Sequence, residues 1–151
     1  MKVFNFESEL WLPTAIENVF AFFSDAQNLE AITPDWLRFR ILTPLPIEMG
    51  TGTLIDYQLR RHGWPIRWRT EITAWQPPHR FVDEQQRGPY RLWVHEHRFE
   101  PKGGGTLCSD HVRYAAPGGA LVHRWLVRPD VERIFAFRAK KLTELLKPSN
   151  S

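Results

Sequence analysis

The spacing of apolar residues changes its period twice along the chain. Val3–Leu12 alternates loosely between apolar and polar positions and predicts a first strand, which Pro13 ends. Apolar residues at helical spacing then predict a short amphipathic helix over 14–24, with Thr14 as the N-cap of a capping box. Asp25–Ile32 is predicted to form another short helix. The first part of the chain is therefore a strand followed by two short helices.

From Leu37 to Ala116 the apolar residues recur at every second position, which is the period of a strand with one buried face. The Gly103–Gly105 triplet predicts a hairpin turn inside this stretch. Together with the first strand, the alternation and the turn signals predict about seven strands. The six predicted here are Arg38–Leu42, Thr51–Arg61, Pro65–Trp75, Arg80–Arg87, Tyr90–Glu100 and Thr106–Ala115.

After Gly118 the helical period returns and predicts a long C-terminal helix. Pro129 either begins a fresh first turn of this helix or kinks it. Beyond the proline, one stripe of the helix is apolar except for Arg138 at its centre. The stripe consists of Val131, Ile134, Phe135, Arg138, Leu142 and Leu145.

Strands and helices are segregated along the chain, which indicates the α+β class with an antiparallel sheet. The 151 residues suit one domain. Six consecutive twisted strands curl strongly, and a curled sheet is too wide for one helix to fill completely. We therefore expect a curved antiparallel sheet around the C-terminal helix, with a ligand-sized space between them.

Composition and charge restrict the classes of partner. Seven Trp and ten Phe indicate an interior lined by large aromatic rings. The formal charge of +3 is spread along the chain without a clustered basic run, which argues against nucleic acid. No apolar run is long enough to span a bilayer, so we expect no stable membrane insertion. A homodimer is compatible with the sequence.

The thiol content and the N-terminus favour a cytoplasmic location. Cys108 is the single cysteine, so an internal disulfide is excluded and a reducing compartment is expected. Glu7 and Glu9 lie where a signal peptide needs an apolar core. We therefore expect a soluble cytoplasmic protein.

Three segments carry a resemblance to a known superfamily. They are Arg80–Thr106, Gly52–Leu59 and Ile134–Arg138. In these segments and in the order of its elements, the chain resembles the START-like superfamily, also called SRPBCC. This group includes birch-pollen-allergen-like proteins, polyketide cyclases and lipid-transfer domains. The resemblance covers nearly the whole chain and implies the helix-grip fold, with residues 1–151 as one START-like ligand-binding domain. The resemblance is specific for the fold and for one subfamily of small bacterial members, but it says little about activity.

A His-x-His pair carries the strongest chemical signal. His95 and His97 are two residues apart on a predicted strand, so both side chains point to the same face of the sheet. The sequence also permits the opposite assignment, with Leu92 and Val94 inward and both histidines in solvent. If the histidines face inward, they form a polar group with residues on neighbouring strands, namely Asp83 and Asp110, with Tyr57 and Tyr114 nearby.

Three interpretations of this group compete. Two histidines with a carboxylate resemble a catalytic metal site, but no cysteine assists and the spacing alone is common. An imidazole with a carboxylate beside it also suits general acid–base catalysis, in which His95, His97 and Asp110 carry the chemistry. A purely structural hydrogen-bonded group is the simplest interpretation. We expect neither a metal nor a cofactor.

Arg138 needs a partner, because an arginine within an apolar stripe cannot stay buried with its charge unpaired. Asp83 and Asp110 are the predicted partners across the cavity. A structural ion pair between helix and sheet is the simpler interpretation. The functional alternative is that Arg138 anchors a carboxylate or carbonyl oxygen of a ligand.

The first hypothesis is therefore a carrier for a hydrophobic small molecule such as a lipid, a quinone or a polyketide-like compound. A cyclase or dehydrase using a His/Asp pair is the alternative, and an accessory interaction domain is the third. The polar group would orient the ligand. The expected cavity wall consists of Phe20, Tyr57, Trp68, Trp93, Tyr114, Phe135 and Leu142.

Overall fold

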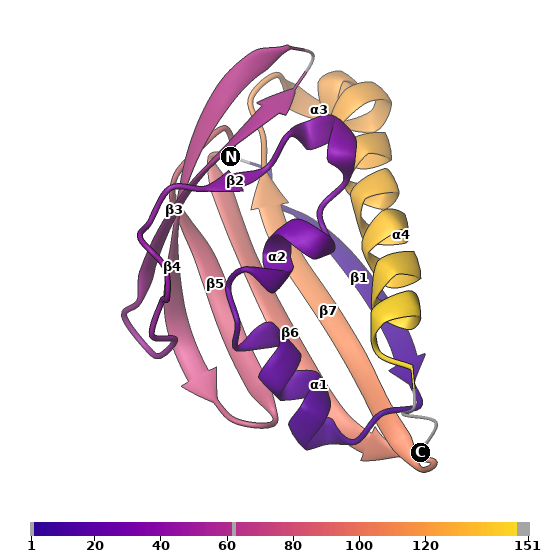
Figure 1. Cartoon of the computed structure of the whole chain (residues 1–151). Helices are drawn as coiled ribbons and strands as arrows, with labels where there is room; N and C mark the ends of the chain where they lie inside the picture. Colours follow the sequence, from indigo (N-terminus) through magenta and orange to yellow (C-terminus); the bar gives the residue numbers. More distant parts are fainter. Residues whose placement is uncertain (1, 62, 148–151) are drawn as a thin grey trace.

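Figure 1 shows a computed structural model of the chain, in which residues 2–61 and 63–147 are described. Its core element is a curved antiparallel sheet with the strand order β1-β7-β6-β5-β4-β3-β2. The first strand pairs with the last, and all other neighbours are consecutive in sequence. The strands are β1 (Phe4–Leu12), β2 (Arg40–Ile41), β3 (Leu54–Arg61), β4 (Trp64–Gln76), β5 (Arg80–Arg87), β6 (Leu92–Lys102) and β7 (Gly105–Ala115).

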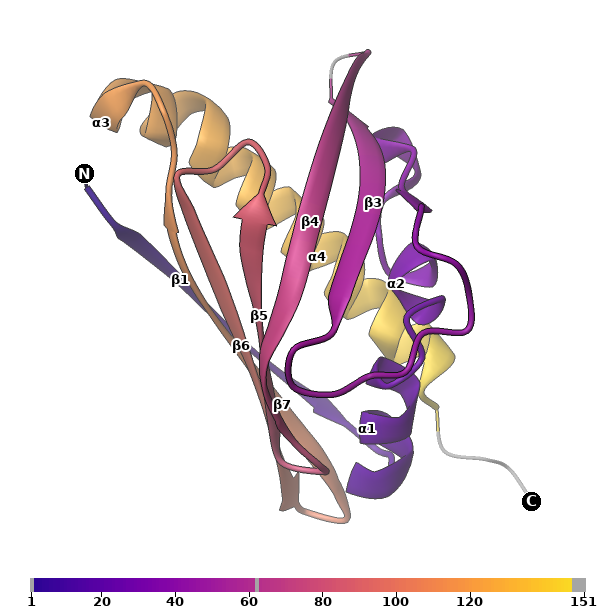
Figure 2. The same ribbon diagram turned by 90° about the vertical axis from the view of Figure 1, so that its left-hand side faces the viewer.

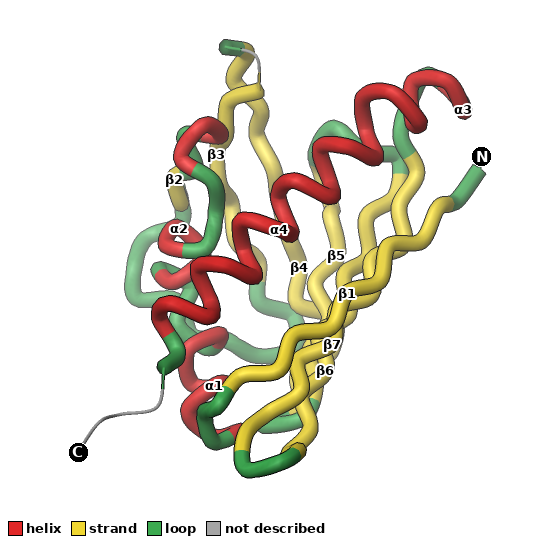
Figure 3. Tube along the Cα trace, turned by 90° about the vertical axis from the view of Figure 1, so that its right-hand side faces the viewer, coloured by secondary structure: helices red, strands yellow, loops and turns green. Residues whose placement is uncertain are grey.

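The helices lie on the concave side of the sheet. The C-terminal helical segment runs without interruption from α3 (Gly119–Val122) through a π-helical turn, η2 (His123–Val127), into α4 (Arg128–Leu145). It crosses the sheet diagonally, as Figure 3 shows. The other helical pieces are α1 (Ile16–Phe23), α2 (Asn28–Ala31) and the 3-10 turn η1 (Asp35–Leu37). The predicted α+β helix-grip class is thus confirmed.

One local prediction is corrected, and one open alternative is decided. The N-cap of α1 is Ala15, with no side-chain cap. The Thr14 hydroxyl instead donates to the carbonyl oxygen of Leu146, 2.6 Å away, and so ties the start of α1 to the end of α4. Pro129 lies in the first turn of α4, directly after the π-helical turn η2, so the fresh first turn is the alternative observed for this proline.

Two packed clusters fill part of the space between sheet and helix. The α1 cluster consists of Leu12, Ile16, Val19, Phe20, Phe23, Ile32, Phe81, Phe99, Cys108 and Leu142. The α4 cluster consists of Val112, Tyr114, Val127, Val131 and Phe135. The predicted apolar stripe of α4 is buried at Val131, Phe135 and Leu142, whereas Leu145 is 49% exposed. The space facing β3, β4 and β5 belongs to neither cluster.

Figure 2 shows that β3 and β4 form a long hairpin at the far end of the sheet from β1. The segment carrying α2, η1 and β2 lies beside this hairpin. Within the described residues, no helix is long and apolar enough to cross a membrane.

Candidate functional site

A cavity of about 200 Å³ lies between the concave face of β3–β6 and α4. Its wall is aromatic on the side of the β3–β4 hairpin. The rings of Tyr57 and Trp68 stack with centroids 5.8 Å apart, and Trp93 meets Trp68 edge-on at 5.6 Å. Phe39 packs against Tyr57 at 4.8 Å. These contacts hold the wall residues in one arrangement around the cavity.

Two polar groups of this aromatic wall are hydrogen-bonded to Thr70. The Trp68 indole N–H donates to Thr70 Oγ1 at 3.0 Å, and the Tyr57 hydroxyl lies 3.2 Å from the same oxygen. Burial raises the pKa of Tyr57 well above its usual value and that of Tyr90 to about 12, so both phenols stay neutral. This end of the cavity therefore behaves as an apolar surface.

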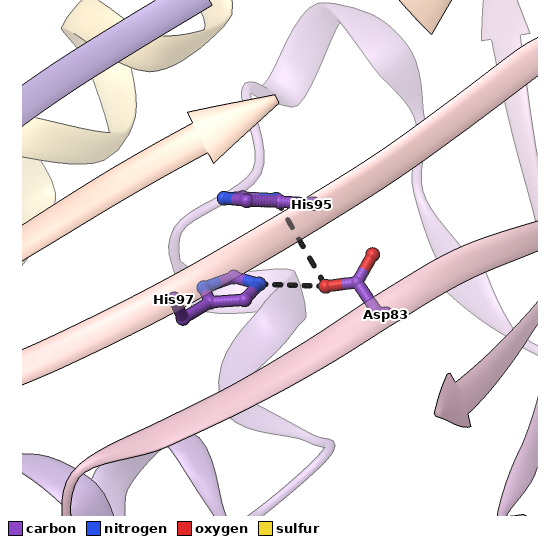
Figure 4. A group of neighbouring side chains, drawn as sticks. All are labelled: Asp83, His95 and His97. Atoms are coloured by element: carbon purple, nitrogen blue, oxygen red, sulfur yellow. Dashed lines mark hydrogen bonds and ion pairs between the residues drawn. The ribbon is translucent and has the colours of Figure 1, made fainter. Parts of the chain in front are cut away.

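The opposite end of the cavity is polar. β6 presents His95 and His97 on its concave face, with Asp83 on β5 and Asp110 on β7 as cross-strand neighbours. His97 Nε2 lies 2.6 Å from Asp83 Oδ2, and His95 Nε2 lies 2.7 Å from Asp110 Oδ1. Figure 4 shows Asp83 reaching toward both imidazoles. The alternation of β6 thus places both rings inward, which resolves the choice of face.

Arg138 on α4 completes the group. Its Nη2 atom lies 3.3 Å from both Asp110 Oδ1 and His97 Nδ1. A guanidinium only donates hydrogen bonds, so His97 Nδ1 must accept and His97 Nε2–H must donate to Asp83. Burial, followed by the neighbouring positive charges, lowers the pKa of His97 well below 6.5. His97 is therefore a neutral imidazole with a defined tautomer.

The two carboxyl groups differ in their environments. Burial raises the pKa of Asp83 above its ordinary value. Burial also acts on Asp110, but the charge of Arg138 and the bond to His95 outweigh it and hold the pKa of Asp110 well below 3.8. Asp83 lines the cavity, whereas Asp110 stands behind the imidazoles. A carboxyl with a raised pKa facing a cavity is suited to accept and return a proton.

The charges at this end limit what it can bind. Arg138 is balanced by Asp110, which leaves Asp83 as the remaining acidic group that faces the cavity. An anionic ligand would therefore find no net positive charge there. Among the described residues, Arg138 Nε is buried without a hydrogen-bond partner. A neutral oxygen, such as a carbonyl, fits this environment better than a carboxylate.

Asp83, His95 and His97 are also residue types that bind metals, and one ligand atom of each lies within 4.8 Å of the others. Coordination by His97 Nε2 would require the proton on that atom to move to Nδ1. That proton would then face Arg138 Nη2, another donor, at 3.3 Å. The hydrogen bonds observed among these residues explain the arrangement more simply, so we do not assign them as metal ligands.

The cavity brings together most of the residues singled out from the sequence, and Asp110 contacts the group from behind. Three others lie elsewhere. The Tyr114 hydroxyl is 2.7 Å from His123 Nε2, within the α4 cluster. Leu142, like Phe20, packs into the α1 cluster, because α1 covers the end of α4 beyond Arg138. The predicted residues that do line the cavity are Tyr57, Trp68, Asp83, Trp93, His95, His97, Phe135 and Arg138.

Several cavity residues are not among those singled out from the sequence. Phe39 falls within the predicted strand Arg38–Leu42, but β2 is shorter than predicted and begins only after this residue. Tyr90 is the first residue of the predicted strand Tyr90–Glu100, but β6 begins only at Leu92, so the alternation of the strand does not place this ring. Leu29, Ile32 and Leu37 come from the segment that carries α2 and η1. Only the tertiary structure places these five beside the predicted residues.

Comparison with known proteins defines the class of the chain. The family model described as "Polyketide cyclase / dehydrase and lipid transport" matches residues 12–140. The chain belongs to this family, and the resemblance to the SRPBCC superfamily is confirmed. No curated protein matches the chain.

Solved structures share the fold at low sequence identity. Protein CV1439 from Chromobacterium violaceum is 14% identical, with a TM-score of 0.77 over 96% of this chain and 98% of its own. Ginseng major latex-like protein 151 from Panax ginseng is 11% identical, with a TM-score of 0.71 over 97% and 99%. Ara h 8.0201 is 18% identical, with a TM-score of 0.64 over 93% and 99%. At these identities the likeness concerns the fold alone.

Proposed function

We propose that the chain, as one ligand-binding domain, holds a largely apolar small molecule with its neutral polar group turned toward Asp83, His95, His97 and Arg138. The observation that carries this proposal is the division of the cavity into two ends. One end is aromatic and internally hydrogen-bonded, and the other holds the buried Arg138 Nε without a partner in the described part of the chain. A lipid, a quinone or a polyketide-like compound with a carbonyl or hydroxyl group has this character.

The size of the cavity suits this class of ligand. A cavity of about 150 Å³ lined by apolar side chains is large enough for benzene. The 200 Å³ here leaves room for a compact ring system. Burial of apolar ligand surface contributes about 25 cal/mol per Å² before the costs of association. Affinity would then come from the aromatic wall, and orientation from the polar end.

Titration calorimetry with three probes on one carbon skeleton tests the proposal. Indane offers only apolar surface, 1-indanone adds a neutral carbonyl, and indane-1-carboxylate adds a charge. We expect 1-indanone to bind most tightly, because its oxygen can accept from Arg138, and the carboxylate to bind most weakly. Tightest binding of the carboxylate would mean that Arg138 acts as an anion anchor. Absence of binding by all three probes would refute the proposal.

A second function is favoured by the contrast between the two carboxyl groups. Asp83, with its raised pKa, faces the cavity, and His97 holds the same carboxyl through Nε2–H. Asp83 could take a proton from a carbon next to a ligand carbonyl, which is a step of cyclase and dehydrase reactions. His95, His97 and Asp110 would then keep that carboxyl and its partners in position, a change from the catalytic role expected for them.

Hydrogen–deuterium exchange at the carbon next to the carbonyl of 1-indanone, followed by NMR in D₂O, tests this step. We expect the protein to accelerate exchange and Asp83→Asn to abolish the acceleration while 1-indanone still binds. Tyr114→Phe, outside the cavity, serves as the matched control. If Asp83→Asn exchanges the probe as fast as the unaltered protein, Asp83 is not the base.

A further inference from the structure

One end of the molecule exposes large apolar side chains from two separate segments. In the C-terminal helical segment Leu121 is 73% exposed, Trp125 68% and Leu126 57%. At the start of β4 Trp64 is 75% exposed. Figures 1, 2 and 3 show the β3–β4 hairpin tip and α3 at the same end of the fold. We call these four residues the apical apolar set.

The same end carries an excess of positive charge. Between His111 and Pro129 the sequence contains no Asp or Glu. Two acidic residues follow, but Asp130 pairs with Arg61 and Glu132 pairs with Arg128. Basic residues from four segments have no ion-pair partner among residues 2–61 and 63–147. They are Lys2, Arg60, Arg91, Arg124 and Arg133.

An outer pocket of about 400 Å³ opens between the hairpin and the start of α4. Arg60, Arg61, Asp130 and Arg133 stand among its lining residues, so its border is charged. The outer pocket and the cavity share five lining residues and are therefore neighbours. The shared residues are Leu37, Leu59, Trp68, Tyr90 and Ile134.

We propose that this end docks on an anionic lipid surface, with the apical apolar set in the headgroup region and the arginines against phosphate groups. Exposed Trp and Leu beside unpaired arginines are the combination that binds such interfaces peripherally. Each basic residue near an anionic leaflet adds attraction that falls with ionic strength. The outer pocket would then face the lipid, so ligand could pass to the cavity without crossing water. This last role rests on the proposed cavity function, whereas docking does not.

The exposed groups at this end favour an anionic lipid surface over two other partners, a second copy of the chain and single-stranded nucleic acid. A two-fold contact between copies of the chain through this end would place arginine against arginine with few acidic partners. Single-stranded nucleic acid would attract the arginines and stack on the tryptophans, but it would leave Leu121 and Leu126 in water. A lipid interface accommodates all the exposed groups at once.

Co-sedimentation of the full chain with vesicles tests the docking. We expect binding to vesicles of phosphatidylglycerol and phosphatidylcholine, loss of binding as salt is raised, and little binding to phosphatidylcholine alone. Arg124→Glu should weaken binding about tenfold at low salt. The double variant Trp125→Ser, Leu126→Ser should abolish it.

Matched controls lie at the other end of the same helix. Lys140→Glu makes the same charge change, and Leu145→Ser removes a leucine that is 49% exposed. Both should bind vesicles like the unaltered chain. Equal binding by Arg124→Glu and Lys140→Glu would overturn the proposal. Absence of vesicle binding would also overturn it, whether or not the chain captures a single-stranded oligonucleotide or dimerises through this end.

The docking and the cavity function can fail separately. The apical variants leave the cavity lining intact, so each should bind 1-indanone in solution with unchanged affinity. Vesicle binding without 1-indanone binding would refute the cavity function and keep the docking surface. Binding of 1-indanone together with no vesicle binding would do the reverse.

Discussion

The two halves of the space between sheet and α4 are built from the same two elements but are filled differently. In one half, α1 inserts Phe20 and Phe23, whose rings meet Phe99 at 5.6 and 5.2 Å. In the other half, only the irregular segment with α2 and η1 lies over β3 and β4, and the cavity remains. The insertion of α1 is therefore what separates the packed half from the half with the cavity in this chain.

The polar group lies at the boundary between the two halves. His97 stacks on Phe81 of the α1 cluster with centroids 3.9 Å apart, and its other neighbour is His95 at 3.6 Å. The Arg138 guanidinium lies over the rings of Phe23 and Phe135. The packed half therefore holds the polar side chains in place for the open half, which is how rigid positioning of a site arises.

The largest expected loss of folding stability comes from removing the charge of Arg138 from the polar group. Arg138→Met keeps an unbranched apolar side chain at this position, shorter than arginine, but leaves Asp110 buried without its cation. Loss of one partner of a buried ion pair costs about 3–5 kcal/mol, so we expect a destabilisation of that order in urea unfolding. The double variant Arg138→Met, Asp110→Asn should recover a large part of the loss. A destabilisation unchanged by the second substitution would show that packing, not charge, is responsible.

The same substitution in each half tests the difference in packing directly. Ile16→Phe enlarges a residue of the α1 cluster and should cost about 1–3 kcal/mol, because a filled core resists added volume. Ile55→Phe enlarges a residue of the cavity wall, where space is free, and should cost less than about 1 kcal/mol. Ile55→Phe should also weaken 1-indanone binding. Equal costs for the two variants would mean that the cavity is not free space.

The polar group at the boundary should make the stability of the folded chain depend on pH. The pKa of His97 in the folded chain lies well below 6.5, because burial opposes its charge. Below pH 6.5 the unfolded chain binds a proton that the folded chain does not, so stability falls as pH decreases through that range. Asp110 contributes stability above pH 3.8 and loses it at lower pH, whereas the raised pKa of Asp83 acts in the opposite sense.

Urea unfolding between neutral pH and pH 5 measures this effect. We expect His97→Gln, which cannot take up the proton, to be less sensitive to pH over this interval than the unaltered chain. His111→Gln, an exposed histidine on β7, is the matched control and should leave the slope unchanged. Identical slopes for all three proteins would exclude His97 as the source.

The smallest effect is expected at the edge of the packed half. Thr14→Val removes the hydrogen bond from Thr14 to Leu146 that joins α1 to the end of α4. A bond of this kind contributes about 0.5–1.5 kcal/mol, and we expect a loss within that range. Binding of 1-indanone should not change, since Thr14 is remote from the cavity. A loss of binding would show that the two halves are coupled through α1.

The spacing of apolar residues in the sequence predicted the helices and strands, and it predicted which side chains share a face within each of them. The alternation of β6 placed His95 and His97 on one face, and the stripe of α4 placed Arg138 among apolar residues in need of a carboxylate. Local spacing depends only on backbone geometry, so such relations can be inferred before the fold is known.

The tertiary structure decided where the interior stays open and which carboxylate does what. α1 packs over Leu142, whereas Phe39 and Tyr90 reach the cavity from positions just before the observed strands β2 and β6. Asp110 is the partner of Arg138, and Asp83 is the carboxyl that faces the cavity. These outcomes depend on contacts between residues far apart in the sequence, which no local pattern encodes.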